Sequence, residues 1–392
     1  MKNLVGACMF AQSGGPTSVI NASAAGVFIE ALGQENITAV YGAAHGIRGV
    51  LHEEFYDISK EDMAELELLK YTPSSALGSV RYKLKDASVD DTDYKRIVEV
   101  FKKYNIRYFF YNGGNDSMDT CNKISKYMAK SGWDCNVIGV PKTIDNDLMA
   151  TDHTPGFASA AKFVATTVKE MLRDVNVYTV KAVTIVEIMG RDAGWLTASS
   201  ALPSLSGDAP AFVYLPEVAF DTDKFIEKVK AAMQINPAVL VCVSEGIRFA
   251  DGEYVGSGNQ SGATDAFGHK YLSGTGKVLE AVVKKRLGCK VRSVELNLPQ
   301  RCAAHIASKT DIEESLGVGA SAVKLALAGE SGVMATIVRN DTAEYSVSFG
   351  KADIRNIANE IKSVPRNYIN ADGDGVTDEC IEYLKPLIVG EV

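Results

Sequence analysis

Residues 107–147 read RYFFYNGGNDSMDTCNKISKYMAKSGWDCNVIGVPKTIDND, and two short apolar runs in this segment flank one amphipathic stretch. The runs Arg107–Tyr111 and Asn136–Val140 predict buried strands, and Ser117–Ser131 between them predicts a helix. Each predicted strand ends in a polar loop that contains Asn and Asp. A buried strand, a helix and a second buried strand are typical of a parallel βαβ unit.

The same alternation continues along most of the 392 residues. Further strands are predicted at Leu4–Phe10, Ala182–Ile188, Ala238–Ser244, Val291–Val294 and Gly332–Val338. Further helices are predicted at Ser18–Leu32, Thr92–Tyr104, Ala158–Leu172, Asp221–Ile235 and Gly274–Leu287. This pattern predicts a doubly wound α/β architecture, in one large or two medium domains. Ligands of such sheets bind at the carboxyl ends of the strands, where the polar loops fall.

Composition and charge limit the classes of partner. The chain is 46% hydrophobic, enough for a full core, and its formal net charge is -8. Proteins that bind nucleic acid usually carry a basic excess, so this charge argues against nucleic acid as the main partner. The apolar run near the N-terminus is too short to span a membrane and predicts a buried strand. Seven scattered cysteines without a C-x-x-C pair favour free thiols in a reducing, cytoplasmic environment.

Two glycine-containing loops are candidates for binding a phosphate. Residues 13–15 (SGG) and residues 113–117 (GGNDS) each stand between a predicted strand and a predicted helix. This order places backbone N–H groups and a helix N-terminus against an anion. Gly pairs also end many strands for steric reasons alone, so both interpretations of residues 13–15 stay open. Asp116 would repel a phosphate unless it holds Mg²⁺ or excludes an unwanted phosphate, although it could also serve only as a helix N-cap.

The heptad Pro141–Asp147 (PKTIDND) is the sharpest candidate for catalysis. It sets Asp145 and Asp147 two residues apart and places Lys142 three residues before Asp145, in a loop after a buried strand. Phosphoryl transfer to an alcohol needs a base for the hydroxyl proton and cations for the charge on the transferring oxygens. The heptad contains both kinds of side chain. A surface turn with an Asx cap is the simpler alternative.

The second half of the chain places Arg and Glu residues in matching loops. These residues are Met189-Gly190-Arg191, Glu245, Arg292, Gln300 and Arg301. Arginines near strand ends also form ordinary ion pairs. Three of them together with a Glu suggest instead a sugar phosphate, with Arg for the phosphate and Glu for the hydroxyl groups.

Two other segments stand apart from these motifs. Residues 249–271 are rich in Gly, Ser and Asp and predict a surface insertion. Residues 371–379 (ADGDGVTDE) invite comparison with a calcium loop that would begin at Asn370. Ile381 stands at position twelve of that loop, where a bidentate Glu is required. A solvated acidic turn is therefore the better interpretation.

Taken in order, the motifs resemble those of the 6-phosphofructokinase family: SGG (13–15), LGSVR (77–81), GGNDS (113–117), PKTIDND (141–147), EIMGR (187–191), SEG (244–246) and QR (300–301). The resemblance implies two doubly wound Rossmann-like α/β domains with the active site in the cleft between them. It implies a phosphoryl-donor domain from residues 1–150 with about 300–350. A fructose 6-phosphate domain would comprise residues 151–299 with part of the C-terminal extension.

The resemblance also implies that fructose 6-phosphate gains a phosphate on its 1-hydroxyl. Asp145 matches the family's catalytic base, with Lys142, Thr143 and Asp116 as further catalytic residues. The implied sugar-phosphate contacts are Thr143, Asp145, Met189, Gly190, Arg191, Glu245, Arg292, Gln300 and Arg301. The implied diphosphate contacts are Gly14, Gly15, Arg81, Gly114, Asn115, Asp116 and Lys142. Family members donate the equivalent of Arg292 across a subunit interface, which implies a homodimer or homotetramer.

The choice of donor depends on two positions. Members that use ATP resemble GGDGS and PGTIDND, whereas this chain has Asp116 and Lys142 in place of the two small residues. This is the pattern of the pyrophosphate-dependent branch. A carboxylate at residue 116 would occupy and repel the site of an α-phosphate, and Lys142 would compensate charge on the transferring pyrophosphate. The implied cofactor is Mg²⁺, with Asn115 and Asp116 beside it.

Three positions depart from the family pattern. Asn115 stands where most members have a metal-linked Asp, Leu298 replaces a polar His or Tyr, and Ala182 replaces a second cross-subunit Arg. An ATP-dependent kinase of the same fold and a non-catalytic regulatory subunit are the alternatives. Loss of Asp145 or Arg191 would mark such a subunit, and both residues are present. A nicotinamide-dependent dehydrogenase is disfavoured because no G-x-G-x-x-G follows the first predicted strand.

Overall fold

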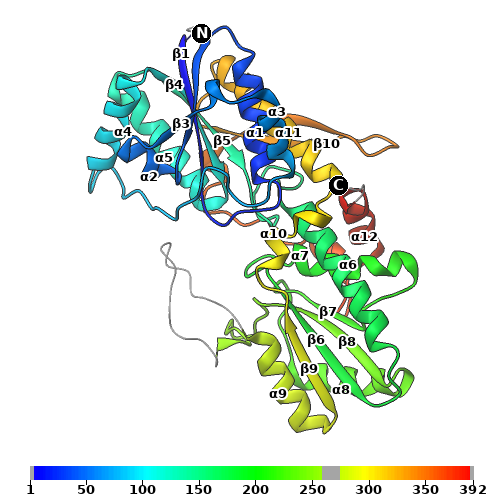
Figure 1. The fold of residues 1–392 in the computed structure, drawn as a ribbon. Helices are drawn as coiled ribbons and strands as arrows, with labels where there is room; N and C mark the ends of the chain where they lie inside the picture. The colour runs from blue at the N-terminus through cyan, green and yellow to red at the C-terminus, as the bar shows by residue number, and fades with distance from the viewer. Residues whose placement is uncertain (1–3, 258–273, 389–392) are drawn as a thin grey trace.

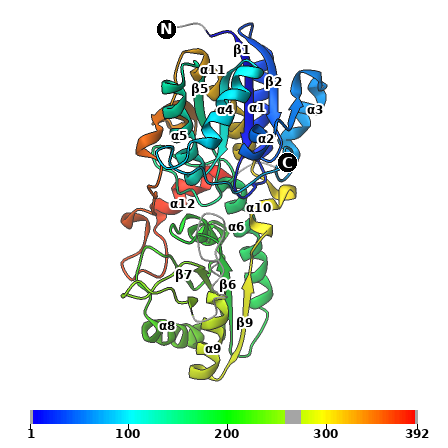
Figure 2. The same cartoon turned by 90° about the vertical axis from the view of Figure 1, so that its left-hand side faces the viewer.

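The computed structural model describes residues 4–257 and 274–388 and contains two β-sheets. Figures 1 and 2 show the sheets in two lobes, one above the other, with the N-terminal strand in the larger lobe. Helices cover both faces of each sheet. This arrangement confirms the prediction of two doubly wound α/β domains. The predicted assignment of chain segments to a donor domain and a sugar-phosphate domain stays a prediction.

The larger sheet has seven strands in the order β11-β10-β5-β4-β1-β2-β3. They are β1 (Gly6–Gln12), β2 (Ile37–Ala43), β3 (Phe55–Asp57), β4 (Ile106–Gly113), β5 (Asn136–Pro141), β10 (Val333–Arg339) and β11 (Val347–Asp353). Only the edge pairs β2–β3 and β10–β11 are antiparallel among these strands. The strand order reverses between β1 and β4, and such a reversal opens the crevice in which α/β sheets bind ligands.

Helices cover both faces of the larger sheet, and alternate side chains of β1 point into the core on each face. The covering helices are α1 (Ile20–Leu32), α3 (Met63–Leu68) and α11 (Lys309–Leu327) on one face, and α2 (Ile47–His52), α4 (Thr92–Lys103) and α5 (Asn115–Ser131) on the other. Cys8 and Phe10 are buried in the cluster that contains α1 and α11. Met9 and Ala11 are buried in the cluster that contains α4 and α5. A strand has a side-chain period of two, so this apolar run supplies both cores.

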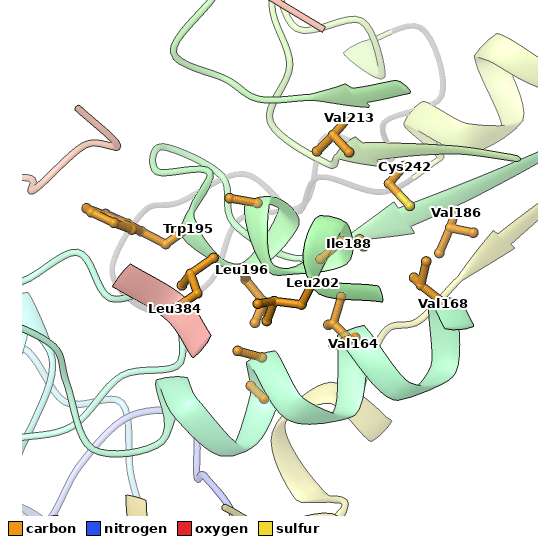
Figure 3. Packing of buried hydrophobic residues seen from close by; sticks show 14 of the residues in the cluster. Val164, Val168, Val186, Ile188, Trp195, Leu196, Leu202, Val213, Cys242 and Leu384 are labelled. Carbon is orange, nitrogen blue, oxygen red and sulfur yellow. The ribbon is translucent and has the colours of Figure 1, made fainter. Parts of the chain in front are cut away.

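The smaller sheet is parallel throughout, in the order β7-β8-β6-β9. Its elements are β6 (Ala182–Ile188), β7 (Phe212–Tyr214), β8 (Ala238–Ser244), β9 (Lys290–Glu295), α6 (Phe157–Val175), α7 (Trp195–Ala198), α8 (Thr222–Ile235) and α9 (Thr275–Leu287). Figure 3 shows Val164 and Val168 of α6 close to Val186 and Ile188 of β6. Leu384 of α12 (Asp378–Leu384) joins the same cluster, so the C-terminal helix packs with the smaller sheet.

The predicted strands are confirmed within a few residues, and Ala182–Ile188 and Ala238–Ser244 have the predicted bounds. The prediction was wrong in omitting strands β2, β3, β7 and β11. It also omitted several helices, of which α11 is the longest.

Close packing explains why α11 escaped prediction. Its internal glycines weaken the helical signal, because glycine costs about 1 kcal/mol relative to alanine in a helix. A Cβ at Gly319 would lie 2.2 Å from the carbonyl oxygen of Ser23 in α1. A Cβ at Gly26 of α1 would lie 2.1 Å from the carbonyl oxygen of Leu316 in α11. The glycines therefore permit a helix crossing that local propensity does not reveal.

The acidic turn near the C-terminus is held by a lysine. Nζ of Lys228 lies 2.9 Å from Oδ2 of Asp372 and also pairs with Asp374. An ammonium group between the two carboxylates fits an acidic turn better than a calcium loop. Residues 258–271 of the predicted surface insertion lie outside the described residues. Within the described ranges, no helix is long and apolar enough to cross a lipid bilayer.

Candidate active site

A cleft of about 830 Å³ lies where the carboxyl ends of strands from both sheets meet. The loops after β1, β4 and β5 contribute one side, and they include the reversal point of the larger sheet. The loops after β6 and β8 contribute the other side. Helix α10 (Pro299–Cys302) lies at the same junction in Figures 1 and 2.

The predicted site residues lie together, with two exceptions. Those that line the cleft are Gly14, Gly15, Arg81, Gly114, Asn115, Asp116, Lys142, Thr143, Asp145, Met189, Arg191, Glu245, Gln300 and Arg301. Gly190 lies just behind the lining, where its N–H donates to Oε1 of Glu245 over 3.3 Å. Arg292 is exposed on β9 and lines a separate small pocket beside the end of α6. It therefore does not reach the cleft of its own chain.

One side of the cleft, called the basic wall, comprises Gly14, Gly15, Arg81, Lys142 and Arg301. Gly14 adopts a φ of 76°, a backbone conformation that glycine reaches without strain. Nζ of Lys142 donates to the carbonyl oxygen of Gly15 over 2.6 Å. A Cβ at residue 15 would lie 2.8 Å from Nη1 of Arg301, so a side chain there would push the guanidinium away from the loop.

Cations in the basic wall lie close enough to disfavour one another. Burial lowers the pKa of Lys142 to about 8; the charges of Arg301 and Arg81 add to this effect, while those of Asp145 and Asp147 oppose it. Burial, followed by the charge of Arg81, also lowers the pKa of Arg301. A cluster of like charges is favourable when an anion bridges it. The basic wall is thus suited to a multiply charged anion such as a diphosphate.

The loop of the heptad Pro141–Asp147 presents its carboxyl groups between the two sides of the cleft. Oγ1 of Thr143 accepts the backbone N–H of Asp145 over 3.1 Å. Oγ1 of Thr154 donates to the carbonyl oxygen of Thr143 over 2.8 Å, which ties the start of the loop to the chain that follows it. Asn146 has a positive φ of 54°, a left-handed conformation that Asn tolerates better than most residues.

Several carboxyl groups of the cleft favour their neutral form. The acidic wall comprises Glu187, Asp192, Glu245 and Glu295, all from the smaller sheet's side. Burial raises the pKa of Glu245 to about 8, helped by the charge of Asp145. Burial also raises the pKa of Glu187 to about 7. Asp145, between the walls, has a pKa raised to about 7 by burial and by the neighbouring Asp147.

Backbone hydrogen bonds fix the loop after β6 against its neighbours. The N–H of Met189 donates to Oε1 of Gln300 over 3.2 Å. Oγ of Ser244 donates to the carbonyl oxygen of Gly190 over 2.5 Å. Leu298, which departs from the family pattern, is half exposed in the cleft lining and contributes no polar side chain there. The polar contacts of this side must come from Gln300, the acidic wall and Arg191.

Asn115 has a role that the motif did not predict. Its side-chain amide donates to the carbonyl oxygen of Glu360, and its Oδ1 accepts the N–H of Asn359. Both ends of the amide thus hold a distant segment, and a direct contact of Asn115 with Mg²⁺ or diphosphate stays a prediction. Asn359 and Ile361 line the cleft as well.

Sequence reasoning missed some of the residues that line the cleft. Glu187 stands inside an apolar strand, and a buried carboxylate in such a run is a signal that could have found it. Asn359 and Ile361 belong to an irregular segment after β11 with no motif of its own. No local signal could have placed that segment beside residues 244 positions earlier in the chain.

The residues present suit a hard cation such as Mg²⁺. Asp116, Asp145 and Asp147 all line the cleft and offer carboxylate oxygens. Oδ1 of Asp147 is buried, and the described residues supply it with no hydrogen-bond partner. Within the described ranges, no group of three His, Cys, Asp or Glu side chains forms a metal cage. Mg²⁺ commonly binds through one or two carboxylates with waters and substrate phosphates, which matches this pattern.

Comparison with known proteins agrees with the geometry. The family model described as phosphofructokinase matches residues 7–326. The chain is 43% identical to the pyrophosphate–fructose 6-phosphate 1-phosphotransferase of Halomonas elongata, over 97% of this chain and 91% of that protein. It is 44% identical to the enzyme of that name from Xanthomonas campestris pv. campestris, over 98% and 92%.

A solved structure described as pyrophosphate-dependent phosphofructokinase from Nitrosospira multiformis is 41% identical to the chain and has a TM-score of 0.89. The match covers 99% of this chain and 93% of that one. Fold, cleft and relatives agree along almost the whole sequence. The chain belongs to the phosphofructokinase family.

Proposed function

We propose that the chain transfers a phosphoryl group reversibly from diphosphate to the 1-hydroxyl of fructose 6-phosphate, in glycolysis. The products are fructose 1,6-bisphosphate and phosphate. The observation that carries this proposal is the basic wall, where Arg81, Lys142 and Arg301 converge on a glycine loop beside Asp145. The names of the relatives, at 43–44% identity, support the same donor and acceptor.

Asp145 is the proposed general base. Its raised pKa of about 7 suits a group that accepts the proton of the 1-hydroxyl as that oxygen attacks the transferring phosphorus. Lys142 and the glycine loop would stabilise charge on the transferring and leaving oxygens, with Thr143 fixing the loop of the base. The bond to the leaving phosphate breaks as the new phosphate ester forms, so charge and atoms balance.

The proposed donor is diphosphate because of Asp116 and Lys142. A nucleotide would bring an α-phosphate toward the carboxylate of Asp116, and this repulsion disfavours ATP. Bound Mg²⁺, held by Asp116 with the diphosphate and nearby carboxylate oxygens, would neutralise charge on the phosphate oxygens. The sugar phosphate is assigned to Met189, Arg191, Glu245, Gln300 and Arg301.

The proposal includes a homodimer or homotetramer. Arg292 faces away from its own cleft, on exposed strand β9, so a contact with the 6-phosphate requires a neighbouring subunit's site. A cytoplasmic location fits a chain whose seven cysteines are all free thiols.

The test is formation of fructose 1,6-bisphosphate from fructose 6-phosphate and Mg²⁺, with diphosphate or ATP as donor. We expect turnover with diphosphate and a rate at least about 100-fold lower with ATP, the size of an effect from a repelled charge. Turnover with ATP alone would overturn the donor assignment while keeping the reaction. No turnover with either donor would favour a non-catalytic subunit.

A further inference from the structure

We propose that Lys362 is a positioning residue for phosphoryl transfer, because its side chain and backbone hold the loop that carries Asp145. Lys362 lies in a segment after β11, here called the strap and defined as residues 359–364. The inference rests on the proposed function, since it concerns the same loop.

The ammonium group of Lys362 is directed at the backbone around the catalytic loop. Nζ donates to the carbonyl oxygens of Asp152 over 2.6 Å and Thr151 over 3.1 Å. It also donates to Oδ1 of Asn146 over 3.3 Å. Asn146 is the left-handed residue directly after Asp145, so this contact acts where the loop turns. One cation thus joins the loop to the chain that leaves it.

The backbone of Lys362 adds contacts on two further sides. Its N–H donates to the carbonyl oxygen of Asp147 over 2.9 Å. Its carbonyl oxygen accepts Nε1–H of Trp195 over 2.8 Å, and its ammonium lies 5.1 Å from the centroid of that indole. Trp195 begins α7 in the smaller sheet's lobe. Lys362 therefore ties the catalytic loop to both lobes at once.

Both ends of the strap are anchored to loops that border the cleft. At one end, Asn115 holds the backbone of Asn359 and Glu360. At the other, Oε1 of Glu217 accepts the N–H groups of Val364 over 2.9 Å and Gly194 over 2.8 Å. The strap is thus fixed to the loop at residues 113–117, to the loop that carries Asp145 and to the smaller sheet's lobe. It can therefore hold these three parts in one geometry.

The charge of Lys362 is kept in a largely buried position, where its donors meet three oxygen atoms. Burial lowers the pKa of Lys362 to about 8, which means that burial opposes the charged form. The carboxyl groups of Asp152 and Asp147 favour that charged form. A buried cation with oxygen partners on several sides orients polar groups more strictly than an apolar side chain would. Because Lys362 does not line the cleft, it acts through the loop and not on the substrate.

The experiment compares full-length wild type with Lys362→Met, Lys362→Arg and Asn146→Gly, using Mg²⁺, diphosphate and fructose 6-phosphate. We expect kcat to fall about 10–100-fold in Lys362→Met, the effect of misplacing a base by about 1 Å. The KM values for both substrates should stay within about twofold. Lys362→Arg should restore part of kcat because it keeps the charge. Asn146→Gly keeps the left-handed turn and should lower kcat less than Lys362→Met does.

The matched control is Lys385→Met, which changes an exposed lysine near the C-terminus and should leave kcat unchanged. A double variant of residues 362 and 146 should lose less than the product of the two single effects, because both changes break one contact. Hydrogen exchange of residues 143–147 should be faster in Lys362→Met and unchanged in the control.

Three results would overturn the inference: an unchanged kcat in folded Lys362→Met, a change confined to KM, or fully multiplicative effects in the double variant. If Lys362→Met does not fold, Asn146→Gly decides alone, and wild-type kcat and exchange in it would overturn the inference. Inactive wild type would instead refute the proposed function, and the inference would fall with it.

Discussion

The basic wall and the acidic wall of the cleft differ in the sign of the charge that burial disfavours. In the basic wall, burial and then the charges of nearby arginines lower the pKa values of Lys142 and Arg301. In the acidic wall, burial raises the pKa values of Glu187 and Glu245. Burial thus disfavours the charged form of two side chains in each wall. This difference fits the proposed division, in which the basic wall binds phosphate groups and the acidic wall binds the neutral hydroxyl groups of a sugar.

Asp145 lies between the walls, so changing it should give the largest effect. Asn at residue 145 keeps the size of the side chain but cannot accept the proton of the 1-hydroxyl. We expect kcat to fall about 10²–10⁴-fold, with KM for both substrates nearly unchanged. Steady-state kinetics with each substrate varied in turn would measure this. The exposed Asp372→Asn is a control, and equal turnover in Asp145→Asn would remove Asp145 from the base role.

One substitution in each wall tests whether the two walls bind different substrates. Lys142→Met should raise KM for diphosphate and lower kcat about 10²-fold, because the transferring oxygens lose their cation. Glu245→Ala should raise KM for fructose 6-phosphate about tenfold, the loss of one hydrogen bond, with KM for diphosphate unchanged. Kinetics of both variants against both substrates would check this. If each change affected the two substrates equally, the division into walls would be wrong.

The smallest expected effect concerns folding stability and involves His153, which lies outside both walls. Its Nδ1 lies 2.8 Å from Oδ1 of Asp152, and its Nε2 pairs with Glu314. Burial opposes its charge, but these two carboxylates outweigh burial and raise the pKa of His153. Asp311 lies close enough to sense the same charge, and Arg339 pairs with Asp152.

A raised pKa in the folded state fixes the sign of the pH dependence. The stability that charged His153 contributes should be fully present below the unfolded pKa of about 6.5 and be lost as the pH rises through the folded pKa. The gap in unfolding free energy between wild type and His153→Gln should therefore narrow toward alkaline pH. Denaturant unfolding at several pH values would measure it, with exposed His52→Gln as control. A gap that widens with pH would contradict the assignment.

Much of this molecule could be predicted from local sequence. The apolar runs of β6 and β8 gave correct bounds because their buried residues are continuous and their ends are marked by polar loops. The heptad Pro141–Asp147 and the loop at Gly14 were placed in one cleft because parallel strands deliver their carboxyl ends to the same edge.

The remainder depended on contacts between distant parts of the chain. Helix α11 was not predicted from the sequence; its glycines weaken the local helical signal, while Gly319 lets α1 approach closely. The strap was missed because its partner Asn115 lies 244 residues earlier and looks like an ordinary loop amide. Local sequence propensity predicts neither of these two long-range contacts.

The order of strands in the larger sheet has a consequence for biosynthesis. Strand β10 pairs with β5, yet the whole smaller sheet is made between them. At ~5–20 residues per second, a ribosome needs roughly 10–40 s to make the roughly 190 residues that separate β5 from β10. During that time β5 is an unpaired edge, the kind of surface on which nascent chains associate wrongly. Codon choice in the segment that encodes residues 142–332 should therefore affect the yield of folded enzyme.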